Sequence, residues 1–217
     1  MSERRSAASR FVIASRTDRY EWGMVTPNGG AHDRPGTQRA GETMRVEFIA
    51  YAGDCRVSGA TTLADGERLT DFLNREFTIV VSGARLTSHA DGHTVEVGEI
   101  TLERDDLFAI ETLGARGEPW RRIHTVRHRL EVRLGPYTVL GQLHTMPGGR
   151  PLVAIGNRLP LIPLTNATIA FNTSDGVEAV DAETLIINRS LADWVRADDD
   201  EQPAFDGVPA PAPDPAI

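Results

Sequence analysis

The chain has 217 residues, of which 40% are apolar and 25% are charged, and its formal net charge is −8. These values are typical of a globular chain with a hydrophobic core and exclude a collagen-like or wholly disordered protein. A single cysteine, Cys55, excludes an internal disulfide framework and any multi-cysteine zinc or iron–sulfur site. All 23 basic residues are arginine, which excludes Schiff-base lysines and the phosphate-loop lysine. The longest apolar run, 159–164, contains two prolines, so no membrane span is expected. The sequence has no phosphate-loop or dinucleotide-binding motif, and no cofactor is expected.

The two ends of the chain differ in charge from its centre. Residues 1–43 hold seven arginines and five acids, and we expect a partly disordered N-terminal arm. They contain no apolar segment of the kind that opens a secretory signal, so a cytoplasmic location is expected. Residues 197–217 hold six acids and no base, followed by alternating proline and alanine at 209–213. This composition predicts a disordered acidic tail.

Residues 44–113 alternate apolar and polar side chains in a way that favours strands. The predicted elements, in chain order, are strands at 45–49 and 55–63, a short helix with apolar Leu69, Phe72 and Leu73, strands at 77–82 and 84–89, and a last strand at 94–103. The order is ββαβββ, which is typical of a small β-barrel or a strongly bent roll.

Residues 129–196 repeat this order at offsets of 82 to 84 residues. Their predicted elements are strands at 129–134 and 137–145, a helical turn with apolar Leu152 and Ile155, strands at 161–165 and 167–172, and a strand at 179–188. We therefore predict a mainly β protein made of two tandem ββαβββ units with pseudo-twofold symmetry. The segment between them, 114–128, is predicted to be a basic linker.

The second unit carries three short motifs, Leu143-His144-x-Met146-Pro147-Gly148-Gly149-Arg150, Leu164-Thr165-Asn166-Ala167 and Ile186-Ile187-Asn188-Arg189. In these it resembles a tandem-repeat domain family of bacterial proteins of unknown function, whose repeats carry the pattern LHxPPGxR…LN…LTxA…NR. The resemblance covers residues 44–196, and the first unit departs widely from the pattern. It implies the duplication and transfers no catalytic residue.

A basic stretch joins the two units and is the strongest candidate for a binding site. Residues 116–133 hold six arginines and two glutamates. In an extended chain, Arg127 and Arg129 would share one face, opposite the apolar positions that follow His128. Together with Trp120, Arg121 and Arg122 they could bind an anion or a nucleic acid, since arginine forks onto phosphates and tryptophan stacks on bases. The alternative is a solvated strand face whose arginines balance nearby acids, and we favour it.

Other reactive side chains form no reaction-specific set. His89 and His93, and likewise His124 and His128, have the i, i+4 spacing of paired metal ligands, but neither pair lies on a predicted helix or has a third ligand. No metal site is therefore predicted. Cys55 has no neighbouring base, and we expect a structural cysteine.

The leading hypothesis for function is a non-catalytic binding or assembly module, with a protein partner or self-association. No catalytic residue is predicted. The alternative is a nucleic-acid or nucleotide-binding small barrel that uses the stretch Arg121–Arg133. A third hypothesis, an enzyme with a site assembled from both units, requires a deep pocket between them.

Overall fold

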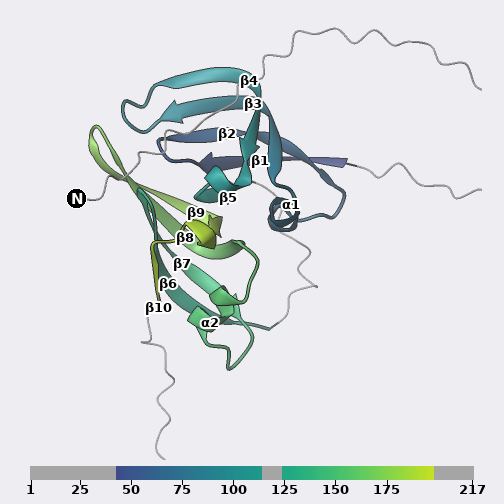
Figure 1. Ribbon diagram of the computed structural model, residues 1–217, viewed down its shortest axis with the longest axis vertical. Coiled ribbons are helices and arrows are strands. Elements are labelled where there is room, and N and C mark those ends of the chain that lie inside the picture. Colours follow the sequence, from purple (N-terminus) through teal and green to yellow (C-terminus); the bar gives the residue numbers. More distant parts are fainter. Residues whose placement is uncertain (1–42, 114–123, 198–217) are drawn as a thin grey trace, which may run out of the picture.

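The computed structural model describes residues 43–113 and 124–197, and in these residues ten antiparallel strands form one open sheet with two short α-helices. The strand order is β10-β6-β7-β8-β9-β5-β1-β2-β3-β4. Figure 1 shows β1–β5 in the upper part of the view and β6–β10 below, with the two groups meeting where β5 lies beside β9. The prediction of a mainly β protein is confirmed.

Residues 43–113 form the first half of the sheet. Its elements are β1 (Thr43–Tyr51), β2 (Cys55–Ala64), α1 (Leu69–Arg75), β3 (Thr78–Ser88), β4 (Thr94–Glu103), a 3-10 turn (Arg104–Asp106) and β5 (Ala109–Thr112). The helix follows its apolar spacing, since Leu69 and Leu73 are one turn apart and both are buried.

Residues 124–197 form the second half with the same order of elements. They are β6 (Val126–Leu134), β7 (Tyr137–Thr145), α2 (Pro151–Gly156), β8 (Leu161–Thr173), β9 (Gly176–Asn188), a 3-10 turn (Arg189–Leu191) and β10 (Trp194–Ala197). The alternation in β6 has the expected result, because Leu130, Val132 and Leu134 are buried while Arg127 and Arg129 are exposed. β6 begins at Val126, inside the segment expected to be a linker.

The strands predicted at 77–82 and 84–89 are one continuous strand, β3, and those at 161–165 and 167–172 are one strand, β8. The single residues left between the predicted strands are bends within each strand. Gly83 and Asn166 adopt positive φ angles of 62° and 46°, and the register to the preceding strand shifts beside both. Gly59 allows the close approach at the first bend, since a Cβ there would lie 2.4 Å from Val81 Cγ1.

Two strands were missed by the sequence analysis, β5 and β10, which have four residues each. β5 pairs with β1 and with β9, and this second pairing joins the halves into one sheet. The sheet does not close into barrels, because the sheet of the described residues ends in two edges, β10 and β4. The other form predicted for each unit, a strongly bent roll, stays a prediction. The strand order also does not show the expected pseudo-twofold arrangement. β5 of the first half lies beside β9 of the second half, so a twofold axis relating the halves would also place β10 beside β4. In the observed sheet β10 and β4 lie at opposite ends.

Two hydrophobic cores lie on the sheet, and each takes residues from both halves. The core of the first half includes Phe48, Leu73 and Ile79, together with Ile186 from β9. The core of the second half includes Leu130 and other aliphatic side chains, and also Tyr51 and Ala109 from the first half. The halves therefore share side chains as well as backbone pairing.

The expected arm at 1–43 and tail at 197–217 lie outside the described residues, apart from Thr43 in β1 and Ala197 in β10. Among the helices of the part that is described, none is long and apolar enough to cross a membrane.

Candidate functional site

The structure separates the residues of the predicted anion site. Trp120, Arg121 and Arg122 lie outside the described residues. Arg127 and Arg129 lie on the exposed face of β6, where Arg133 also lies and donates to Thr138 Oγ1 at 2.9 Å. This face is therefore a row of arginines along one strand.

The acids near this row partly balance it. Glu131 lies on the same face of β6 and pairs with Arg196 of β10 across 3.6 Å. A shallow hollow of about 200 Å³ lies beside this pair and is also lined by Arg129 and Leu140. Such exposed pairs contribute little to stability, and the arrangement fits a solvated strand face.

Neither histidine pair forms a metal site in the described residues. No group of three or more histidine, cysteine, aspartate or glutamate side chains there could hold an ion. His128 Nε2 contacts Thr145 Oγ1 at 2.9 Å, while His124 is exposed. His93 is also exposed, and its predicted partner His89 turns instead toward the second half of the sheet.

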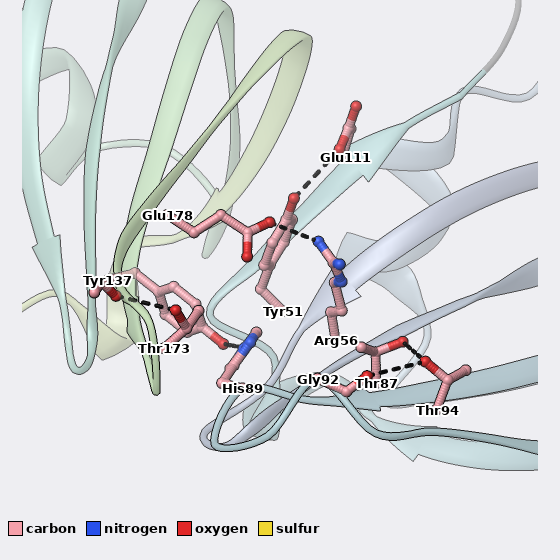
Figure 2. A network of polar contacts seen from close by, with 11 residues as sticks. Tyr51, Arg56, Thr87, His89, Gly92, Thr94, Glu111, Tyr137, Thr173 and Glu178 are labelled. Atoms are coloured by element: carbon pink, nitrogen blue, oxygen red, sulfur yellow. Dashed lines mark hydrogen bonds and ion pairs between the residues drawn. The ribbon is translucent and has the colours of Figure 1, made fainter.

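A polar and aromatic cluster, hereafter the junction cluster, lies where the two halves meet (Figure 2). Its members are Tyr51 at the end of β1, Arg56 on β2, His89 in the turn after β3, Glu111 on β5, Tyr137 on β7, Phe171 on β8 and Glu178 on β9. They come from seven different elements, and the sequence analysis singled out only His89 among them.

The aromatic rings pack in the middle of the cluster. The rings of Tyr51 and Tyr137 meet edge to face with centroids 5.7 Å apart, and the His89 ring lies 4.4 Å from that of Phe171. Both tyrosines are almost completely buried. Contacts of this kind add to the apolar burial that joins the two halves.

Hydrogen bonds fix the orientation of the buried groups. The Tyr137 hydroxyl donates its one hydrogen to the carbonyl of Ala52, so it accepts in its 2.7 Å contact with His89 Nε2. His89 therefore carries a hydrogen on Nε2. At the rim, Arg56 donates to Glu178 Oε1 at 3.2 Å, and Tyr51 donates to Glu111 Oε2 at 3.4 Å.

The environment shifts the pKa values of four groups in the junction cluster, Tyr51, Tyr137, His89 and Glu111, in favour of their neutral forms. Burial raises the pKa values of both tyrosines far above their ordinary value. Burial lowers the pKa of His89, and the nearby Arg56 guanidinium lowers it further. Burial also raises the pKa of Glu111. Neutral aromatic groups suit packing between the halves better than proton transfer in water.

Cys55 is buried next to this cluster and holds a free thiol. Burial, followed by the negative charge of Asp54, raises the pKa of the thiol to about 12. At neutral pH the thiol is protonated, and a protonated thiol is a poor nucleophile. This agrees with the interpretation of Cys55 as a structural residue.

A larger hollow lies on the outer face of β2, β3 and β4. It measures about 580 Å³, is open to solvent, and is lined by Ile49, Arg56, Ser58, Arg85, Thr87, Thr94 and Glu96. Its two arginines already have carboxylate partners, since Arg85 pairs with Glu96 at 2.7 Å and Arg56 pairs with Glu178. The hollow thus offers hydroxyl groups and paired charges, in a site open to water.

Asn74 makes a second polar contact between the halves, which we call the Asn74 clasp. From α1, its side-chain nitrogen donates to the carbonyl of Leu161 at 2.9 Å, and its side-chain oxygen accepts from the Leu161 N–H at 3.0 Å. The Asn74 amide thus bonds the backbone N–H and carbonyl of Leu161 in the way that a neighbouring strand would. The recurrence of Asn-Arg at 74–75 and 157–158 is the sequence signal that points to this position.

Comparison with protein-family models, with curated proteins and with solved structures gives no match for this chain.

Removing the Asn74 clasp should destabilise the protein. Asn74→Ala leaves the buried backbone of Leu161 without its partner, which costs about 2 kcal/mol. The free energy of unfolding in urea, measured by circular dichroism, tests this. Asn172→Ala, at an exposed asparagine of β8, is the control and should change stability by no more than about 0.5 kcal/mol. Equal effects of the two variants would contradict the role of the clasp.

The protein should lose stability as the pH falls below about 6.5. Because the pKa of His89 is lowered in the folded protein, the unfolded chain takes up a proton first and is favoured by acid. The pKa of His144 is also lowered, mainly by burial, so His89→Gln should remove only part of this slope. Urea unfolding midpoints between pH 7 and pH 5 measure it, with exposed His93→Gln as the control. A slope that is the same in His89→Gln and in the original protein would disprove the assignment.

Proposed function

We propose that the chain is a non-catalytic binding or assembly module, built from a duplicated β unit and acting through the exposed edges of its sheet. The duplication comprises residues 44–113 and 129–196. It is also what the resemblance to the bacterial tandem-repeat domains implies.

Matching backbone contacts support the duplication. The N–H of Arg104 donates to the carbonyl of Phe77 at 2.9 Å, and that of Arg189 donates to the carbonyl of Pro160 at the same distance. After each 3-10 turn, the next backbone bonds also correspond. Those pairs are Leu107 to Arg104 and Phe108 to Tyr51 in the first half, and Ala192 to Arg189 and Asp193 to Arg133 in the second. The positive φ angles of Gly83 and Asn166 fall at the same place in each unit.

The main support for the proposed function is the pair of exposed edges at which the described sheet ends. In the middle of the sheet, the edge strands of the two halves, β5 and β9, are paired with each other. β10 and β4 each have a strand on one side only among the described strands. An unpaired edge offers a row of backbone donors and acceptors to which another strand can add. The space between the halves, in contrast, is filled by the junction cluster.

The backbone pattern shows which groups of β4 are available. In an antiparallel strand, successive residues direct their N–H and carbonyl groups to opposite sides. The N–H of Arg104 points to the β3 side, toward Phe77, so Leu102 and Ile100 point the same way. Thr101 therefore points away from β3, and it is exposed. Val195 corresponds to Ile110 of β5. The N–H groups of Leu113 and Glu111 point toward β1, so that of Ile110 points away from β1, and by this correspondence Val195 points away from β6.

Blocking these edges should abolish partner binding. Thr101→Pro and Val195→Pro each remove an outward N–H, and proline is tolerated on an edge strand. We expect the tagged full chain, purified from the cells that produce it, to retain a stoichiometric protein that is lost from at least one of the two variants. Thr101→Val and Val195→Thr keep the N–H and serve as controls. The proposal fails if no stoichiometric protein, including further copies of the chain, is retained, or if both proline variants retain it.

The row of arginines on β6 supports a second candidate function, nucleic-acid binding. Arg127, Arg129 and Arg133 lie on one exposed face, which is the arrangement that contacts successive phosphates. The charge balance supplied by Glu131 and its ion pair with Arg196 makes this the weaker proposal.

Nucleic-acid binding, if it is the function, should weaken steeply with salt. Each phosphate contact lowers the logarithm of the affinity by roughly 0.7 for each unit of log salt concentration on a single strand. Fluorescence anisotropy of a labelled single-stranded RNA should show this slope, and Arg127→Glu with Arg129→Glu should abolish binding. An affinity independent of salt, or no binding at low salt, would remove this candidate.

A further inference from the structure

The junction between β5 and β9 shows how one unit of this protein binds another. Its register sets Ala109 opposite Ile187, Ile110 opposite Ile186 and Glu111 opposite Leu185. Ile110 and Ile186 are completely buried and enter the same core. The N–H of Asn188 adds a bond of 2.9 Å to the carbonyl of Phe108. The two units use different edges, so the contact is head to tail.

Both edges of this junction occur a second time, and there they have no pairing strand among the residues that the structure describes. This step rests on the proposed duplication, in which the 3-10 turns at 104–106 and 189–191 align the units. The counterpart of β9 is β4, and the counterpart of β5 is β10. Thr101 then corresponds to Ile186 and Val195 to Ile110. Both free edges (Figure 1) therefore present the geometry that is paired inside the chain.

Both residues of the Asn74 clasp have counterparts in the other half of the chain. At an offset of 83 residues, Asn157 at the end of α2 corresponds to Asn74, and Thr78 at the start of β3 corresponds to Leu161. Asn157 and Thr78 are both exposed, whereas Leu161 is buried. The second clasp thus has its amide on the β10 side of the chain and its backbone partner on the β4 side. This contact is independent of the strand pairing and fits the same orientation.

The charges on the two edges favour pairing of β4 with β10 over pairing of β4 with β4. β4 carries Glu96, Glu99 and Glu103 and no basic residue. The opposite edge carries Arg196 on β10 and the arginines of β6 next to it. Pairing of β4 with β4 would bring acids together, whereas pairing of β4 with β10 brings opposite charges together.

A large apolar side chain stands at the basic edge. Trp194 is 42% exposed and corresponds to Ala109, which is completely buried against the second half. In a pairing that copies the internal junction, Trp194 lies opposite Leu102 of the neighbouring chain. A tryptophan at such an edge is typical of a protein–protein contact.

We propose that the partner at the sheet edges is a second copy of this chain, with β10 of one copy paired to β4 of the next. The register sets Val195 opposite Thr101, and Asn157 of the first copy clasps the backbone of Thr78 of the second. The interface is heterologous, so copies add in one direction and form a ring or an open chain.

The sharpest test combines two variants that block opposite edges. Purified full-length chain is studied by sedimentation velocity and light scattering, with circular dichroism to confirm folding. The original protein should form species larger than two chains. Thr101→Pro keeps only the β10 edge and Val195→Pro keeps only the β4 edge, so each alone should be a monomer. Mixed in equal amounts, they should form a dimer of one copy of each and nothing larger.

A third variant leaves both edge strands intact. Asn157→Ala removes both hydrogen bonds of the proposed clasp at an exposed residue and should weaken self-association at least about tenfold. Thr101→Val and Val195→Thr keep the backbone donors and should assemble like the original protein.

Three results would overturn the inference. They are an original protein that stays monomeric at all concentrations, a proline variant that still dimerises by itself, and an Asn157→Ala variant that associates as tightly as the original. A monomeric chain that still retains a different protein at one edge would leave the proposed function in place and remove only the second copy as partner.

Discussion

The pairing of β5 with β9 is the interaction on which the rest of the structure depends. β5 has only four residues, yet it connects the two halves of the described sheet and places Ile110 and Ile186 in one core. Complete burial of an isoleucine side chain contributes about 1.5–3 kcal/mol, so these two residues outweigh any exposed ion pair at the junction. The junction cluster and the Asn74 clasp add contacts between the same two halves, from residues that are far apart in sequence.

The sequence predicts the long strands well, because their alternation is local. The predicted strand at 137–145 has the observed bounds, and the one at 94–103 does as well. The breaks predicted at Gly83 and Asn166 are bends within one strand, because glycine and asparagine adopt positive φ angles in bulges as well as in turns. β5 and β10 were missed because four residues are too few for a pattern, and distant strands determine their conformation.

The candidate site was harder to predict than the fold. His89 was considered as a metal ligand, but its Nε2 donates to Tyr137 from the other half, and no local spacing encodes that contact. The arginine row was predicted correctly as one face of a strand, since that needs only a period of two. Asn74 was visible as a recurring residue, but the same residue type also ends helices, and only the three-dimensional contact with Leu161 separates the two roles.

Because both halves of the sheet belong to one chain, the junction within the chain and the proposed junction between chains respond differently to dilution. The β5–β9 contact is intramolecular, so its partners stay at a high effective concentration whatever the amount of protein. A contact of the same geometry between chains has no such tether and depends on how many chains are present. Dilution would therefore separate whole chains from one another and leave the two halves of each chain joined.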